Sequence, residues 1–84
     1  MTHQQFFPFH NRLIRFSKKD GVYLEGVIVD LIPYSKKKKD TDYIFIPIEN
    51  LEEWKNADDR GDSSLKLTLQ FTIDIKDIVD AAKI

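Results

Sequence analysis

The chain has 84 residues, no cysteine and a formal net charge of −1. A chain of this length predicts one small domain over residues 1–84, with room for a single hydrophobic core. The lack of cysteine excludes a disulfide framework, thiolate metal ligands and a cysteine nucleophile. The amino terminus does not resemble a signal peptide, and no apolar run approaches the roughly 18 residues of a membrane span. We therefore expect a cytoplasmic protein with no membrane partner.

An aromatic segment opens the chain. Thr2 and Gln5 have the spacing of a helix capping box, but Pro8 follows too soon for a helix to be expected, so residues 1–9 are predicted to be an irregular arm. The arm carries Phe6, Phe7 and Phe9, which together are too apolar to remain in water. It is predicted either to plug one end of the core, which we favour, or to form a self-association surface.

The next segments predict a β-hairpin. Asp20-Gly21 separates an apolar and basic run, residues 10–17, from a second apolar run, residues 22–32, and an Asp-Gly pair in this position is typical of a tight hairpin turn. Gly26 lies in the middle of the second strand and has no side chain to pack. We expect it to mark a sharp bend or a close approach of another backbone segment.

The middle of the chain combines a basic loop with a third strand. Residues 33–42 include Tyr34 and four consecutive lysines, which cannot be buried together and so predict an exposed loop. Residues 43–48 are apolar on both faces of a predicted third strand. Pro47 donates no backbone hydrogen bond, which places it at a sheet edge or at the end of the strand.

The remaining elements complete the predicted fold. Residues 49–57 predict one or two helical turns, and residues 79–84 predict a short helical tail. Residues 65–75 alternate apolar and polar side chains throughout, which predicts a long strand with one wet face. The fold class expected from these elements is mainly β: a small, strongly bent barrel of four to five strands with short helical turns.

The hairpin and the glycine-containing strand resemble a motif of the Sm-like small β-barrels. The similar residues are Asp20-Gly21-x-x-Leu24-x-Gly26-x-Ile28-x-x-Leu31. The resemblance implies a bent barrel that assembles into rings through edge strands and contacts RNA. The chain departs from the family at residues 72–75, because an Arg-Gly or Lys-His pair is expected there and none is present.

No enzyme signature is present. The three glycines, at positions 21, 26 and 61, are too scattered to form a phosphate-binding loop, and no Ser-His-Asp arrangement is evident. Only His3 and His10 could supply nitrogen ligands, so neither a metal site nor a cofactor is expected.

Two binding functions remain open. The first is a non-enzymatic binding or assembly module for a protein partner or a second copy, with an interface formed by Phe6, Phe7, Phe9, Tyr43, Phe45 and Trp54. The second is an RNA- or DNA-binding protein, in which tyrosines 23 or 34 stack on bases and lysines contact phosphates. The residues of the second site are Lys18, Lys19, Lys36, Lys37, Lys38, Lys39 and Tyr34.

Overall fold

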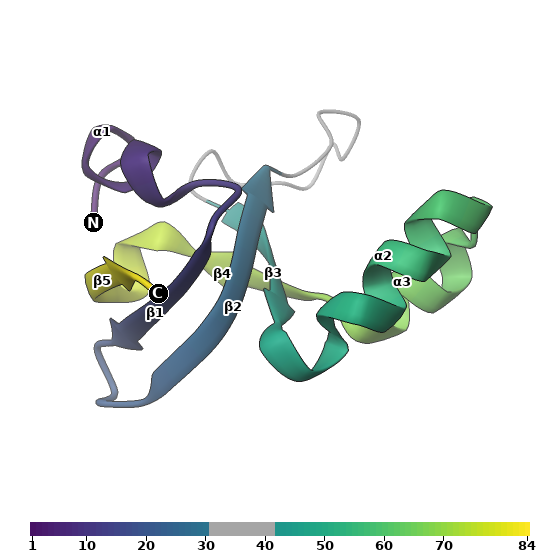
Figure 1. The fold of residues 1–84 in the computed structure, drawn as a ribbon. Coiled ribbons are helices and arrows are strands. Elements are labelled where there is room, and N and C mark those ends of the chain that lie inside the picture. The colour runs from purple at the N-terminus through teal and green to yellow at the C-terminus, as the bar shows by residue number, and fades with distance from the viewer. Residues whose placement is uncertain (31–41) are drawn as a thin grey trace.

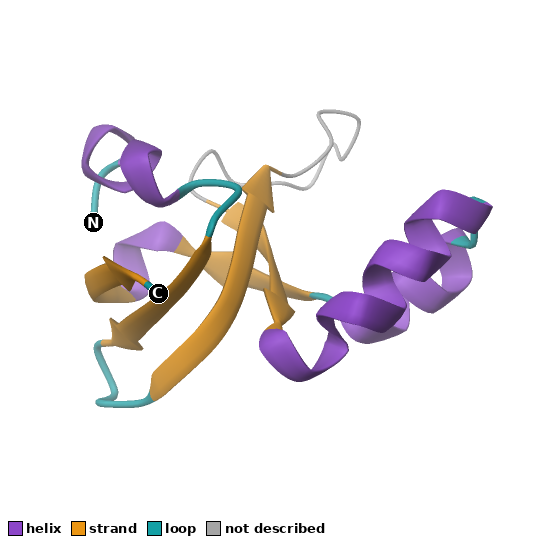
Figure 2. Ribbon diagram, viewed as in Figure 1, coloured by secondary structure: helices purple, strands orange, loops and turns teal. Residues whose placement is uncertain are grey.

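The computed structural model describes residues 1–30 and 42–84, apart from the side chains of His3, Asp30 and Asp42. It shows a five-stranded antiparallel sheet with accompanying helices, a small mixed α/β domain (Figures 1 and 2). The strand order is β4-β3-β2-β1-β5. The strands are β1 (Leu13–Lys18), β2 (Tyr23–Asp30), β3 (Asp42–Pro47), β4 (Phe71–Asp74) and β5 (Ile78–Lys83).

The predicted hairpin is confirmed. The turn between β1 and β2 is closed by a hydrogen bond from the Gly21 N–H to the Lys18 carbonyl, 2.9 Å long. The Val22 N–H donates to the Asp20 carboxylate at 3.0 Å. Gly21 has a φ of 84°, which glycine adopts without strain. Local turn chemistry therefore sets the register of this pair of strands.

Another backbone segment approaches closely at Gly26, which is one of the two alternatives predicted for this position. A Cβ atom at this position would overlap the carbonyl oxygen of Ile46 on β3 and would lie 2.7 Å from Cε1 of Phe45. Only a residue without a side chain fits between β1 and β3 here.

The sheet is strongly curved. Its two edge strands, β4 and β5, are consecutive in the chain and are joined only by the 3-10 helix η3 (Ile75–Asp77). The outer strands of a flat five-stranded sheet would lie roughly 19 Å apart, whereas one turn of 3-10 helix spans about 6 Å. The sheet must therefore curl. Among the described residues β4 does not pair with β5, so the sheet is not closed.

The prediction of one long strand over residues 65–75 is wrong in its first half. Residues 63–69 form the helix α3 (Ser63–Leu69), and only β4 continues as a strand. Asp62 caps this helix, because its carboxylate accepts a hydrogen bond from the Leu65 N–H at 3.1 Å. The leucines that alternate in sequence also fit a helix, in which Leu65 and Leu69 lie four residues apart on one side.

The predicted helical tail is also wrong. Residues 78–83 form β5, which pairs with the free side of β1 in a register that joins Ile14 to Lys83 and Phe16 to Ala81. The predicted helical turns after β3 are confirmed and extend further than expected, as η2 (Ile48–Asn50) followed by α2 (Leu51–Arg60).

The amino-terminal segment is more ordered than predicted. The capping box forms, with the Thr2 N–H donating to Gln5 Oε1 at 3.0 Å and the Gln5 N–H donating to Thr2 Oγ1 at 3.2 Å. It supports α1 (His3–Phe6), and Pro8 lies within the 3-10 helix η1 (Phe7–Phe9). Proline is tolerated there because the first turn of a helix has unsatisfied N–H groups in any case.

The core fills the concave side of the curved sheet. Phe16 and Phe45 meet there edge to face, with ring centroids 5.2 Å apart. The plug interpretation of the arm is confirmed for Phe6, which is buried in this core at 5.3 Å from the Tyr43 ring. The other buried members of the core are Ile14, Ile28, Ile73, Ile75 and Ile78.

Candidate functional site

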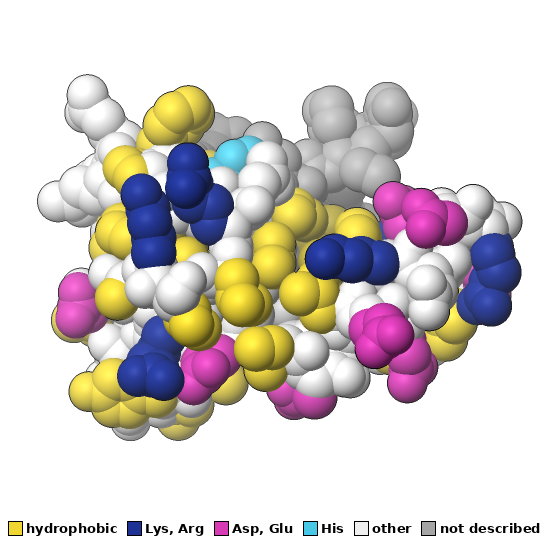
Figure 3. All heavy atoms as spheres, viewed as in Figure 1, with side chains coloured by type: hydrophobic (Ala, Val, Ile, Leu, Met, Phe, Trp, Pro, Cys, Tyr) yellow, Lys and Arg dark blue, Asp and Glu magenta, His cyan; other side chains and the backbone are white. Residues whose placement is uncertain are grey.

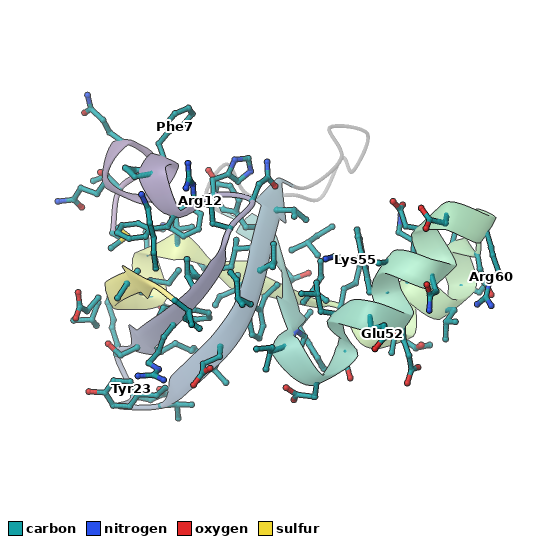
Figure 4. All side chains as sticks on the ribbon, in the orientation of Figure 1. Phe7, Arg12, Tyr23, Glu52, Lys55 and Arg60 are labelled. Carbon is teal, nitrogen blue, oxygen red and sulfur yellow. The ribbon has the colours of Figure 1, made fainter. Side chains whose placement is uncertain are left out.

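The plug covers one end of the curved sheet, and the other end is open. Phe6 packs beside Tyr43 at the start of β3. A cavity of about 780 Å³ lies at the end of β3, bordered by Phe45, Pro47 and Ile48. Figure 4 shows the two ends of the sheet, with Phe7 beside α1 at the upper left and Tyr23 at the lower left, where β2 begins. We call this open cavity the mouth.

Three large apolar side chains at the mouth are exposed. Tyr23 from β2, Ile48 from η2 and Phe71 from β4 have exposed fractions of 73%, 43% and 55%. The buried Phe45 and Ile73 line the same cavity and form its floor. Apolar side chains that converge around a cavity are characteristic of binding surfaces, whereas scattered ones are ordinary.

Unpaired backbone also borders the mouth. Phe71, Thr72 and Ile73 are consecutive in β4, and all three line the cavity. Successive side chains of a strand point to opposite faces, so a cavity that reaches three consecutive residues lies along the edge of that strand. Because β4 is the last strand in the sheet order, this edge has no partner among the described residues. Its N–H and C=O groups can therefore accept another strand.

The charges at the mouth are mixed. Lys18, Glu25 and Glu49 contribute to its lining. Lys18 lies 3.9 Å from Asp20, and Glu25 accepts from Arg15 at 3.1 Å, both at the surface. No charged partner of Glu49 is found within the described part of the chain. The mouth therefore carries one more carboxylate than ammonium, which disfavours a polyanion.

A second, smaller groove separates the helices from the outer face of the sheet. It has a volume of about 260 Å³ and is bordered by Val29, Ile44, Trp54 and Leu67. The Trp54 indole N–H donates to Gln70 at 3.0 Å. The Lys66 ammonium lies 4.8 Å from the Trp54 ring. These contacts hold α2 and α3 together, so we interpret this smaller groove as part of the packing between the two helices and not as a binding site.

The remaining surface is less distinctive. On the face shown in Figure 3, acidic side chains are prominent over α2, while apolar side chains gather over the sheet. No cluster of three metal-ligating side chains is found in residues 1–30 and 42–84. None of the described helices is long and apolar enough to span a membrane.

The predicted interface residues are dispersed in the structure. Phe6 and Phe45 are buried in the chain's own core, whereas Phe7 is 76% exposed at the plugged end. Phe9 and Tyr43 are half-buried, and Trp54 lies at the helical junction. Only Phe45 reaches the mouth, where it forms part of the floor.

The third strand is not available as an edge. β3 pairs with β2 on one side and with β4 on the other. Its missing N–H predicted that Pro47 lies either at a sheet edge or at the end of a strand, and it lies at the end of β3. The alternative that Pro47 marks a sheet edge is therefore wrong, because β3 is paired with a strand on each side.

The predicted nucleic-acid residues are placed only in part. Lys18 reaches the mouth, and the Lys19 N–H donates to the Asp77 carbonyl at 2.9 Å beside the hairpin turn. Tyr34 and Lys36–Lys39 lie outside the described residues. The position of one lysine group relative to the other therefore lies outside what the structure describes.

Sequence reasoning did not identify Phe71 and Ile48 as surface residues. Phe71 continues the alternation of residues 65–75 and was expected to be buried, whereas Ile48 was expected to belong to the third strand. No local pattern marks either one, because the mouth forms where the ends of β2, β3 and β4 meet.

The chain matches no family model, and comparisons with curated proteins and with solved structures also found no match.

Proposed function

We propose that the protein is a non-enzymatic interaction module that binds an extended segment of a protein partner along the free edge of β4, over the mouth. The observation that carries this proposal is that three exposed residues, Tyr23, Ile48 and Phe71, line one cavity beside an unpaired strand edge. Addition of a strand supplies main-chain hydrogen bonds, and the neighbouring apolar cavity selects alternate side chains.

We also propose that the sheet is a partly open barrel, as the resemblance to Sm-like proteins implies. The short η3 connection between the two edge strands supports this proposal, because it draws the edges toward each other. In such a barrel the mouth is the accessible end of the interior, and the amino-terminal plug covers the opposite end. An incoming strand would extend the sheet beside β4.

Nucleic-acid binding is the competing function. Lys18 beside exposed aromatic side chains favours it, since bases stack on such rings. Glu25 and Glu49 oppose it, because they would lie close to phosphates bound at the same cavity. The balance of charge at the mouth supports a polypeptide.

A selection from a random peptide library displayed on phage, with the full chain immobilised, tests the proposal. Selected peptides should bind the parent and lose about tenfold or more in affinity for Phe71→Asp, because a charge replaces an aromatic contact. Leu67→Asp is the matched control, since Leu67 is 69% exposed and lies on α3 away from the mouth. Peptides that bind Phe71→Asp and the parent equally would contradict the proposal.

Two further measurements test the competing occupants. Fluorescent oligo-uridine binding that is stronger than peptide binding, and weakened by Phe71→Asp, would assign the mouth to nucleic acid. Sedimentation at several concentrations tests a second copy as the occupant. In the second copy, β5 forms the other edge of the sheet and exposes Val79. Association of the chain with itself, lost in Phe71→Asp, would replace the foreign partner with a second copy.

A further inference from the structure

The position of the carboxylates at the mouth restricts the kind of segment that fits. Glu25 lies at the start of β2, and Glu49 lies in η2 directly after Ile48. Residues 23–25 extend beyond the last residue of β2 that pairs with β3, which is Gly26 opposite Pro47. The two carboxylates therefore lie at the rim, beyond the end of the apolar floor.

The two carboxylates differ in their surroundings. Glu25 already accepts hydrogen bonds from Arg15, at 3.2 Å from Nε and 3.1 Å from one terminal nitrogen. Glu49 is exposed and has no charged partner among the described residues. Lys18 is drawn toward the hairpin turn by Asp20. Glu49 is thus the rim charge that an incoming cation can pair with.

We propose that the partner segment carries a large apolar side chain followed two residues later by arginine or lysine. Residues two apart in a strand point to the same face. When an apolar side chain of the partner enters the cavity against Phe45 and Phe71, the side chain two residues later points to the same face and lies at the rim. There its methylene groups would contact Ile48 and its charge would approach Glu49. Arginine should bind better than lysine, because a guanidinium also stacks on an aromatic ring such as Tyr23.

This inference rests on the proposed function, so its test separates the two. Fluorescently labelled peptides with an otherwise identical alternating Thr and Val sequence would carry Phe-Thr-Arg, Phe-Thr-Gln or Phe-Thr-Glu at the centre. A fourth peptide with Phe-Arg-Thr keeps the composition and moves the charge to the opposite face. Binding to the full chain is measured by fluorescence anisotropy at low salt.

The expected order of affinity is Arg, then Gln, then Glu. Each step should be about three- to fivefold, the size of a partly exposed charge pair. The peptide with adjacent Phe and Arg should bind no better than the Gln peptide. Glu49→Gln should remove the preference for Arg over Gln. Glu53→Gln, an exposed carboxylate on α2 that does not line the mouth, is the matched control and should keep the preference.

The possible failures are distinguishable. Equal binding of all four peptides, together with loss of binding in Phe71→Asp, would overturn the preference for a basic residue while supporting peptide binding at the mouth. Tighter binding of the Glu peptide would also overturn it. If none of the peptides binds the parent at millimolar concentration, the inference and the proposed function both fail.

Discussion

At the scale of single residues, Gly26 is the position that the sheet tolerates least. An added Cβ would meet the main-chain oxygen of Ile46, which cannot rotate away as a side chain can. We expect Gly26→Ala to lower the free energy of unfolding by about 1–3 kcal/mol through overpacking. Urea denaturation followed by circular dichroism measures this change. An unchanged denaturation midpoint would show that β2 and β3 do not approach each other at this point.

The aromatic plug offers a second comparison between residues. Phe6 is buried in the core, whereas the adjacent Phe7 is largely exposed. Phe6→Ala should lower the free energy of unfolding by about 3–5 kcal/mol, because it leaves a cavity. Phe7→Ala should change it by less than about 0.5 kcal/mol. Equal effects of the two substitutions in urea denaturation would refute the placement of the arm over the core.

At the scale of elements, α3 is the segment in which structure and sequence pattern differ most. Asp62 accepts a hydrogen bond from the Leu65 N–H, so Asp62→Ala should lower the free energy of unfolding by about 1 kcal/mol. Asp59→Ala is the control, because Asp59 is exposed and caps no helix start. If residues 65–69 formed a strand, Asp62 would cap no helix, and the two substitutions would change the free energy of unfolding equally in thermal or urea denaturation.

The sequence predicts those elements whose signals are local. Asp20-Gly21 sets the β1–β2 turn. The close backbone approach at Gly26 was expected, because glycine has no side chain to pack within a strand. The leucines at 65, 67 and 69 satisfy both a strand and a short helix, and the cap at Asp62 decides between them. The strand at the end of the chain could not be predicted, because its partner β1 lies more than half the chain away. Non-local pairing leaves little trace in local sequence.

The mouth was not predictable for the same reason. Phe45 and Trp54 were expected at an interface because they are aromatic, yet one forms the floor of the mouth and the other holds the helices together. Exposure of Phe71 depends on β4 being an edge strand, which is a property of the sheet order. The chemistry of the candidate site therefore appears only once the ends of three strands are brought together.

At the scale of the whole molecule, the proposed function predicts how the basic segment behaves. If Lys36–Lys39 bound phosphates, affinity for single strands would fall with a log-log salt slope of about −2.8. We expect instead that replacing all four lysines with serine leaves peptide binding unchanged and does not alter oligo-uridine binding. Titrations of both proteins at about 50 and 200 mM salt measure this. A slope lost on replacement would assign nucleic-acid binding to these lysines.

The central claim is that an extended segment pairs with the free edge of β4 over the mouth. Nuclear magnetic resonance of the ¹⁵N-labelled chain, titrated with the Phe-Thr-Arg peptide, tests it most directly. Strand addition at β4 predicts that backbone amide shifts concentrate at residues 71–73 and 23–25, and that exchange of the β4 amides slows. Shifts that concentrate at the Trp54 indole and α3, or the absence of any shift at millimolar peptide, would contradict it.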